Sequence, residues 1–222
     1  MQGMWGAAMR NQWYADNRDL IKWGVLLQLA NRFEAKRILQ VAYYRSSAFG
    51  SLVIDGQERD LQEDVVAHFR NLRTIEKISS KVQVTVFDFL FQDRKNYEDE
   101  VFALLAWKER CIVFLDPDTG LQPPDNGPKP RKPKHEHVLA SEATAVWTRM
   151  KPLDVLAFYQ HQTNRNGQPW IKPKQCQLAK AIGVQVQEVK TAQASANPHS
   201  KQTVRLPQDV VIFYIQKPAA TK

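Results

Sequence analysis

Two carboxylates follow a buried apolar run in the stretch C-I-V-F-L-D-P-D-T-G-L-Q-P, residues 111–123. Asp116 and Asp118 flank Pro117, which fixes the backbone and lacks an N–H donor, and Gly120 lets the chain turn away. Carboxylates at a strand end can accept hydrogen bonds from an amine or a ribose hydroxyl, or bind a hard cation. They can also accept backbone N–H groups in an ordinary acidic turn. Both aspartates are candidate catalytic residues.

A second polar group, Y-Q-H-Q-T-N-R at residues 159–165, follows another apolar run. His161 is a candidate catalytic residue, because imidazole can act as a general base, a metal ligand or a hydrogen-bond donor. Gln160 and Arg165 are candidate substrate-binding residues, since an amide can pair with a nucleobase edge. If the two strands are parallel neighbours, this group stands beside Asp116. The alternative is a strand end whose histidine is satisfied locally.

A third cluster lies in W-Y-A-D-N-R-D-L-I-K-W-G, residues 13–24, at the start of an expected helix. Asp16 or Asn17 can cap this helix. Asp19 and Lys22 are three residues apart and share a helix face. Lys22 could meet a carboxylate or a phosphate, so we take Asp19 and Lys22 as candidate cofactor-binding residues. Helix capping with an ordinary ion pair explains the same pattern.

Residues 121–137, L-Q-P-P-D-N-G-P-K-P-R-K-P-K-H-E-H, form a proline-rich basic stretch without an apolar period. We expect an irregular loop there. Lys129 and Arg131 are candidate substrate-binding residues, because lysine and arginine bind phosphates without reading bases. The closing H-E-H could bind a metal, although a solvated linker has the same composition.

Several phosphate-binding and catalytic motifs are absent from the sequence. It has no GxxxxGK[ST] loop, no GxSxG elbow and no metal-type Cys/His spacing. No GxGxxG follows the first expected strand, where A-Y-Y-R-S-S-A-F-G stands at residues 42–50. Ser46 and Ser47 in that turn are therefore the remaining candidates for cofactor binding there.

The composition of the chain limits the kinds of partner and the cellular environment that we expect for these residues. The chain has 222 residues and a formal net charge of +8, which attracts polyanions such as nucleic acid or a phosphorylated ligand, and a solvated lysine-rich surface explains the same charge equally well. Two cysteines without a CxxC pair indicate a reducing, cytoplasmic environment. No apolar run approaches the roughly 20 residues of a membrane span, and the start does not read as a signal peptide. The oligomeric state stays open.

The elements that must position the candidate residues alternate between helical and strand patterns. This alternation predicts one α/β domain over residues 1–222, with a mainly parallel Rossmann-like sheet, helices on both faces and an antiparallel strand pair at the C-terminus. Ligands of such sheets bind beyond the carboxyl ends of the strands, near a topological switch point. We expect helices at 17–33, 60–75, 96–110, 140–150 (capped by Ser141) and 172–183, an Asp55-Gly56 turn, and strands at 37–46, 82–91, 111–116, 154–162, 184–192 and 209–217.

The segments Y-A-D-N-R-D-L-I-K-W-G-V-L-L, F-L-D-P-D-T-G-L and Y-Q-H together resemble an uncharacterised bacterial family. Its members open with a Tyr-Phe-Gly-Asp-x-x-Asp-Tyr-x-Lys-Tyr-Gly-Leu-Leu pattern and carry an Asp-Pro-Asp-x-Gly-Leu turn in mid-chain. The order of motifs covers nearly the whole chain, and the resemblance brings no settled chemistry with it. The matching positions are Tyr14, Asp16, Asp19, Lys22 and Gly24, and Trp23 is the aromatic residue at the position of the pattern's tyrosine between lysine and glycine.

The chain is more distantly similar to bacterial ribosomal-RNA adenine-N6 methyltransferases, which carry an Ala-Gly-Asn-x-Ala-Asp-x-x-Lys-His segment. Asp19 to Lys22 match its Asp-x-x-Lys part, and in that family the lysine lies near the S-adenosylmethionine site. The family's strand-end Asp-Pro-Pro-Tyr corresponds to residues 116–119. The resemblance implies that Asp116 would receive the target amine of a flipped base.

The chain departs from that family at two places. Asp118 and Thr119 replace the second proline and the tyrosine, so the aromatic stacking platform is missing. The glycine-rich turn that approaches the methyl donor is missing too. These losses affect the implied activity more than the implied methyltransferase-like fold.

Three functions follow as expectations. The first is an S-adenosylmethionine-dependent methyltransferase-like protein acting on nucleic acid. The second is a nuclease or phosphoesterase in which Asp116, Asp118 and His161 gather Mg²⁺ or Mn²⁺. The third is a non-enzymatic module on the same fold that binds nucleic acid or protein. All three need the first helix and the two strand ends to meet.

Overall fold

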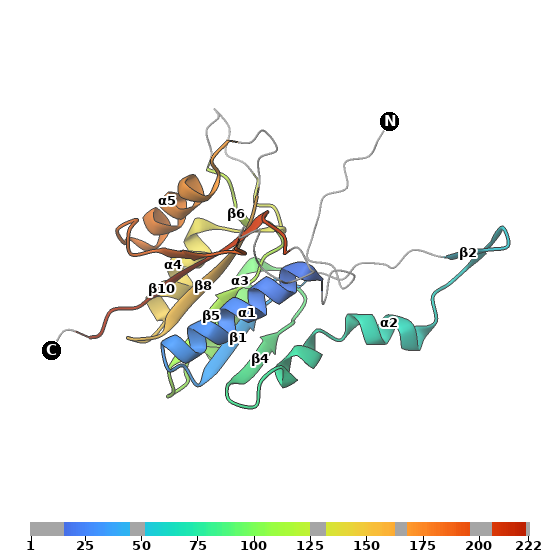
Figure 1. Ribbon diagram of the computed structural model, residues 1–222, viewed down its shortest axis with the longest axis horizontal. Coiled ribbons are helices and arrows are strands. Elements are labelled where there is room, and N and C mark those ends of the chain that lie inside the picture. Colours follow the sequence, from blue (N-terminus) through green and yellow to red (C-terminus); the bar gives the residue numbers. More distant parts are fainter. Residues whose placement is uncertain (1–15, 45–51, 125–131, 163–167, 196–205, 221–222) are drawn as a thin grey trace.

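The computed structural model describes residues 16–44, 52–124, 132–162, 168–195 and 206–220. One six-stranded sheet has the order β4–β1–β5–β8–β10–β9 (Figure 1). The strands β4, β1, β5 and β8 are parallel neighbours, whereas β10 runs antiparallel to both β8 and β9. The predicted α/β fold, with its mainly parallel sheet and C-terminal antiparallel pair, is therefore confirmed. The strands are β1 (Arg37–Val41), β4 (Gln83–Phe87), β5 (Cys111–Leu115), β8 (Val155–His161), β9 (Lys190–Ala192) and β10 (Val210–Gln216).

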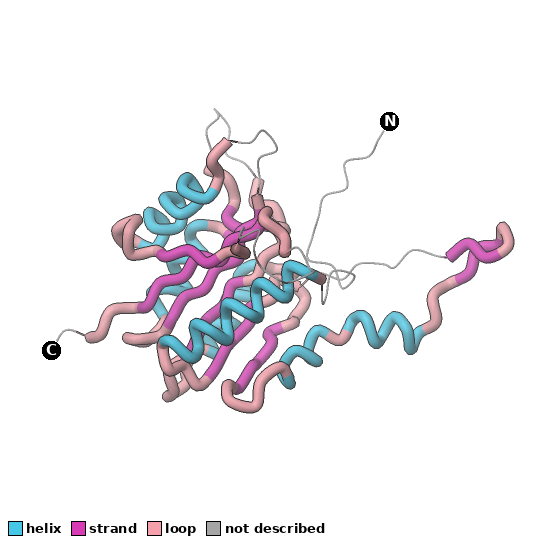
Figure 2. The backbone as a smooth tube through the Cα atoms, viewed as in Figure 1, coloured by secondary structure: helices cyan, strands magenta, loops and turns pink. Residues whose placement is uncertain are grey.

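Helices cover both faces of this sheet (Figure 2). One face packs against α1 (Asn17–Arg32) and the 3-10 helix η2 (Leu72–Lys77). The other face packs against α3 (Arg94–Leu104), α4 (Ala140–Arg149) and α5 (Ile171–Ile182). Burial on both faces explains why β5 is a continuous apolar run without alternation. No described helix combines the length and apolar character needed to cross a bilayer.

Helix α1 begins at the cap that the sequence predicts. Asp16 is the N-cap residue, and its Oδ1 accepts hydrogen bonds from the backbone N–H groups of Arg18 at 2.7 Å and Asp19 at 3.0 Å. This cap orders the first turn, from which Arg18, Asp19 and Lys22 extend. The start of α1 thereby lies beside the carboxyl ends of the parallel strands (Figure 1).

The turn after β5 is held by one side chain from β8. Gln160 is fully buried, and its Oε1 accepts a hydrogen bond from the backbone N–H of Leu121 at 3.0 Å. Its Nε2 donates to the carbonyl oxygen of Thr119 at 2.8 Å. Gly120 has φ of 109°, and a Cβ at this position would overlap the Gln160 amide. The turn therefore requires both the glycine and the glutamine.

The ends of the basic stretch are ordered by a short parallel ladder. β6 (Gly120–Leu121) pairs with β7 (His137–Val138), so the expected irregular loop over 121–137 begins and ends in strands. Arg94 of α3 fixes the returning chain, because its guanidinium donates to the carbonyl oxygen of Lys134 at 2.7 Å. The same guanidinium forms an ion pair with Glu142 at 2.6 Å.

Several predicted element boundaries differ from the structure: β1, β4 and α3 end earlier than expected, and two further differences have identifiable local reasons. The helix expected at 60–75 divides into α2 (Glu63–Arg70) and η2, with Asn71 between them. The strand expected at 184–192 is reduced to β9, because Gln185 and Glu188 close a turn through reciprocal hydrogen bonds of 2.7 Å and 3.0 Å.

The start of α4 also differs from its prediction. Ser141 lies inside the first turn and is not the cap. Instead the side chain of Glu142 accepts a hydrogen bond at 2.8 Å from the backbone N–H of Leu139, the N-cap residue. A carboxylate three residues into a helix can satisfy the N-cap amide without any polar residue at the cap itself.

A hairpin and a helix between β1 and β4 stand apart from the sheet (Figure 1). β2 (Leu52–Ile54) pairs antiparallel with β3 (Gln57–Arg59), and α2 follows. The connecting Asp55 and Gly56 have φ of 52° and 77°, which are the positive values of a type I′ turn. The expected Asp55-Gly56 turn is therefore confirmed.

Replacing Gly120 by alanine should destabilise the fold. The new Cβ would displace the Gln160 amide and require a strained φ, and we expect a loss of about 1–3 kcal/mol in the free energy of unfolding. Gly24→Ala is the matched control, because nothing lies within 4 Å of its Cβ position in α1 and alanine favours a helix by about 0.5–1 kcal/mol. Urea denaturation measures both variants. Equal effects of the two substitutions would contradict the clamp.

Candidate functional site

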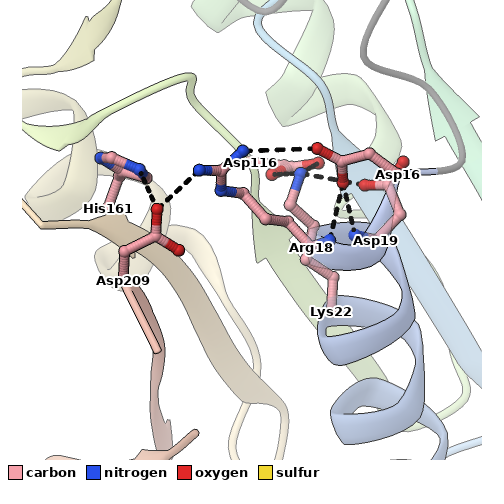
Figure 3. A network of polar contacts seen from close by, with 7 residues as sticks. All are labelled: Asp16, Arg18, Asp19, Lys22, Asp116, His161 and Asp209. Carbon is pink, nitrogen blue, oxygen red and sulfur yellow. Dashed lines mark hydrogen bonds and ion pairs between the residues drawn. The ribbon is translucent and has the colours of Figure 1, made fainter. Parts of the chain in front are cut away.

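The ammonium group of Lys22 joins helix α1 to the end of β5. Its Nζ lies 3.0 Å from Oδ1 and 3.3 Å from Oδ2 of Asp116, and 3.2 Å from Oδ1 of Asp19 (Figure 3). Asp116 is 0% exposed and Lys22 6%. A buried charge is tolerated when it is paired. Here one buried cation is shared between two carboxylates.

Gln40 of β1 completes this group. Its Nε2 donates to Oδ2 of Asp116 at 2.7 Å, and the residue is buried. Two buried acceptors are left over: neither Oε1 of Gln40 nor Oδ1 of Asp116 receives a hydrogen bond from the described part of the chain. Oδ1 of Asp116 has only its ion pair with Lys22. Because buried acceptors are rarely unsatisfied, this pair has capacity for a donor from outside the described chain.

The sheet topology gives this group its place. The chain passes from β1 outward to β4 and then returns to β5 on the opposite side of β1. The loops after β1 and β5 therefore leave in opposite directions, which makes the β1–β5 boundary a topological switch point. Gln40 lies on β1 and Asp116 directly follows β5, with its backbone N–H bonded to the carbonyl oxygen of Val41 at 2.9 Å.

The charges in the group shift each other's pKa values. Burial raises the pKa of Asp116 to about 6, since Lys22 and Gln40 only partly offset the desolvation and Asp19 adds a second negative charge. Burial opposes the charge on Lys22, but the carboxylates of Asp116 and Asp19 outweigh it and raise the pKa of this lysine. Lys22 therefore stays charged while Asp116 titrates within an accessible pH range.

A second polar chain lies beside the first. His161 Nε2 is 3.0 Å from Oδ2 of Asp209, the residue before β10, and the same oxygen accepts a hydrogen bond of 2.6 Å from Arg18 (Figure 3). Arg18 also lies 3.5 Å from the capping carboxylate of Asp16. Burial opposes ionisation of Asp209, but Arg18 and His161 outweigh it and lower the pKa of this carboxyl group.

Tyr159 stands between the two polar chains. The Nζ of Lys22 lies 4.4 Å from the centroid of its ring, a distance typical of a cation–π contact. Burial raises the pKa of Tyr159, and the charges that act on it come from both sides, namely Lys22 and Asp116, then Arg18 and Asp209. The lysine and histidine groups thus belong to one continuous region along the carboxyl edge of β5 and β8.

Gln160 and Asp118, which neighbour Tyr159 and Asp116, lie outside the lysine and histidine groups. β8 is a parallel neighbour of β5, so the Y-Q-H group does stand beside Asp116. Gln160, however, points to the opposite face of the sheet from Tyr159. Its amide forms hydrogen bonds with the backbone of Thr119 and Leu121 in the turn after β5. Its position supports a structural role rather than the expected contact with a substrate. Asp118 is partly exposed in the same turn.

Five other candidates lie outside the described residues. They are the expected cofactor-binding Ser46 and Ser47 and the expected substrate-binding Lys129, Arg131 and Arg165.

The cation beside the two carboxylates is the Lys22 ammonium. A metal ion would have to displace it in order to approach Asp116. Within the described ranges, no three His, Cys, Asp or Glu side chains gather closely enough to hold a metal ion. The arrangement is thus a lysine–carboxylate network with amide and tyrosine neighbours.

Gln40, Arg18 and Asp209 are site residues that were not expected from the sequence. Gln40 carried a usable signal, because a glutamine inside the buried run R-I-L-Q-V must find a polar partner. Nothing in the sequence indicated Asp209, because its approach to His161 depends on the antiparallel insertion of β10 between β8 and β9.

Comparison with known proteins found no match, either to a protein-family model or to a curated protein. The fold and the geometry of the site are therefore the basis for a functional assignment.

Removing the shared cation should be costly. Lys22→Met leaves Asp116 buried without its partner, and we expect a loss of about 3–5 kcal/mol in the free energy of unfolding. The exposed Lys36→Met is the control and should change stability by less than about 0.5 kcal/mol. Adding Asp116→Asn to Lys22→Met should recover part of the loss. A single-variant cost no larger than the control's would disprove the buried pair.

The raised pKa of Asp116 predicts a pH-dependent stability. Between about pH 4, where an unfolded aspartate titrates, and about pH 6, the native state holds a proton that the unfolded state has released. Wild-type stability relative to Asp116→Asn should therefore fall as the pH rises through this window. Asp209→Asn is the opposite control: because its pKa is lowered, the wild type gains on this variant as the pH rises toward about 4, and the difference is then constant between about pH 4 and 6. Chemical denaturation at stepped pH measures both differences, and equal slopes would contradict the assignment.

Proposed function

We propose that this chain is an S-adenosylmethionine-dependent methyltransferase-like protein that acts on nucleic acid, with its cofactor at the switch point between β1 and β5. The observation that carries the proposal is the buried group of Lys22, Gln40 and Asp116 at that point. In open α/β sheets, ligands bind outside the carboxyl ends of the strands where the strand order reverses. The fold supports the proposal by analogy, and the site supports it by its chemistry.

The unsatisfied acceptors fit this cofactor. Oε1 of Gln40 and Oδ1 of Asp116 can each accept one more hydrogen bond. S-adenosylmethionine presents N–H and O–H donors on its amino groups and ribose, and when bound it supplies an electrophilic methyl group. Lys22 would hold Asp116 in place while Oε1 of Gln40 accepts a hydrogen bond from such a donor, and Oδ1 of Asp116 stays available for the methyl acceptor. The nearby ring of Tyr159 borders the same region.

His161 is suited to handle the acceptor's proton. Its Nε2 faces the carboxylate of Asp209, which favours the tautomer with the proton on Nε2 and leaves Nδ1 free to accept another. The side chain is about one third exposed, so a substrate can approach it. Arg18 fixes Asp209 from the other side. Such an oriented imidazole can take the proton that a methylated nitrogen or oxygen must lose.

The charge of the chain supports a nucleic-acid substrate. A formal net charge of +8 favours binding to phosphates in a sequence-independent and salt-dependent way. Asp116 would accept hydrogen bonds from a base amine, as the resemblance to the ribosomal-RNA methyltransferases implies. Because Asp118 and Thr119 offer no aromatic platform, the target base would have to stack elsewhere.

Titration with S-adenosylmethionine in a calorimeter tests the cofactor half of the proposal. We expect saturable binding, weakened at least about tenfold by Gln40→Leu because the variant removes one acceptor and leaves Asp116 without its amide. Gln216→Leu is the matched control, since that glutamine lies at the far end of β10 and bonds to Leu153. The absence of saturable binding at about 1 mM cofactor would refute the proposal.

Transfer of a labelled methyl group to RNA and DNA tests the substrate half. His161→Ala should reduce transfer while leaving cofactor binding within about twofold of wild type, because its role concerns the acceptor. Cofactor binding without transfer to either nucleic acid would refute the assigned substrate while leaving the cofactor site intact.

A further inference from the structure

The edge of the sheet that lies opposite the candidate site is strongly basic. β4, β1, β5, β8 and β9 are parallel to one another, so the loops that lead into them meet at one edge, where β10 also ends. We call these loops, each counted with its flanking helix and strand residue, the amino edge. They contain eleven basic and four acidic residues, over the ranges 32–37, 77–83, 104–111, 149–155, 182–190 and 216–220.

The carboxyl edge has the opposite balance within the described part of the chain. Counted in the same way, its loops contain three basic and seven acidic residues, over the ranges 16–17, 41–44, 87–94, 115–124, 132–140, 161–162, 168–171, 192–195 and 206–210. A surface of this sign repels phosphates, whereas the amino edge attracts them. The affinity for a polyanion that these described loops can supply therefore comes from the amino edge.

Three exposed lysines lie on neighbouring loops of the amino edge. Lys36 precedes β1, Lys81 precedes β4 and Lys108 precedes β5, and we call these three the lysine cluster. Backbone hydrogen bonds join their loops: the N–H of Lys36 donates to the carbonyl oxygen of Arg110 at 3.0 Å, and the N–H of Gln83 donates to that of Lys36 at 2.9 Å. Because neighbouring strands lie about 5 Å apart, the cluster forms one continuous basic surface.

The acidic residues of the amino edge leave this charge largely uncompensated. Asp154 is buried and accepts hydrogen bonds of 2.8 Å and 3.1 Å from backbone N–H groups. Glu188 accepts a backbone N–H at 2.7 Å, and Glu34 forms an ion pair of 3.6 Å with Arg110. Glu109 is exposed. No residue of the lysine cluster forms an ion pair with an acidic residue of the described ranges.

Arg37 adds a guanidinium group with a fixed orientation beside the lysine cluster. Its Cζ lies 3.1 Å from the centroid of the Trp107 ring, and its Nη2 donates to Oγ1 of Thr85 at 3.5 Å. Both Arg37 and Trp107 are partly exposed. A guanidinium stacked on an aromatic ring is pre-organised and presents planar N–H donors that match a phosphate group.

The distance between the two edges limits which polyanion could use both. Arg110 and Asp116 lie at the two ends of β5, six residues apart, which at about 3.3 Å per residue is a separation of about 20 Å. A nucleic-acid strand advances about 3.4 Å per nucleotide, so about six nucleotides span this distance. A polymer can therefore contact the amino edge while its target lies at Asp116, but a single nucleotide cannot.

We propose that the amino edge is a second nucleic-acid-binding surface, at which the lysine cluster and Arg37 bind the phosphate backbone of a long substrate. The identity of the polyanion rests on the proposed function, and the location of the surface rests on the charges described above. Phosphate contacts hold a strand without reading its bases. The amino edge therefore supplies affinity, and the carboxyl edge selects the residue that reacts.

Fluorescence anisotropy with labelled RNA and DNA strands of about 25 nucleotides tests the proposal without cofactor or methyl transfer. The test variant replaces the whole lysine cluster (Lys36→Gln, Lys81→Gln and Lys108→Gln). We expect it to bind both strands at least about tenfold more weakly than the wild type at about 0.1 M salt. Its salt dependence on a log–log scale should be shallower by about 2, because each lost phosphate contact lowers the slope by about 0.7–0.9.

Two further variants separate this surface from net charge alone. The matched control replaces three exposed lysines near the carboxyl edge (Lys95→Gln, Lys132→Gln and Lys172→Gln) and should weaken binding less than about threefold. Replacing the lysine cluster by arginine keeps its charge and should keep the wild-type affinity and salt dependence. Equal weakening by the two glutamine variants overturns the proposal, and so does a wild-type affinity in the test variant.

The outcome can be distinguished from failure of the proposed function. The test variant should bind S-adenosylmethionine as the wild type does, because the lysine cluster lies at the other end of the strands. A wild-type chain that binds nucleic acid through the lysine cluster but does not bind the cofactor would refute the methyltransferase proposal alone. A wild-type chain that binds phosphatidylserine vesicles but neither RNA nor DNA would assign the amino edge to a membrane surface and overturn the present proposal.

Discussion

The position of α1 at the carboxyl edge of the sheet depends on a single buried cation that is paired with two carboxylates. Lys22 reaches from α1 across the carboxyl edge of the sheet to Asp116, and Asp19 on its own helix adds the second negative charge. Neither charge would be tolerated at this depth alone, because desolvation costs more than one hydrogen bond returns. The pair therefore fixes where α1 begins relative to β5, and with it the position of Arg18 and the second polar chain.

Successive side chains at the end of β8 point to opposite faces of the sheet and have different roles. Tyr159 and His161 face α1 and border the ionic groups, whereas Gln160 faces the opposite side and holds the turn after β5. One strand end thus supplies both the candidate chemistry and the scaffold that shapes it. Any shift of register by one residue would exchange these roles and lose both.

The sequence predicted the sheet well because its strands are apolar runs that cannot remain exposed, and the helices between them follow from apolar spacing. The meeting of the first helix with Asp116 was also expected, because each of the three functions needed the first helix and the two strand ends to come together. The sequence did not predict Asp209, whose contact with His161 spans 48 residues and depends on tertiary topology. Gln160 was assigned to a substrate because sequence does not say which face of a strand an amide occupies. The sequence indicated the Asp55-Gly56 turn but not that β2, β3 and α2 stand apart from the sheet, because the residues of β2 and β3 are all exposed and follow no apolar pattern.

The reversed direction of β10 has a consequence for biosynthesis. A parallel strand brings its last residue to the functional edge, but an antiparallel strand brings its first, and so Asp209 arrives there ahead of the seven residues that anchor it. During translation the histidine can be oriented only after β10 has left the ribosome and inserted between β8 and β9. A nascent chain or a variant that lacks β10 would carry Lys22 and Asp116 yet lack an oriented His161, so the two polar chains become complete at different stages of synthesis.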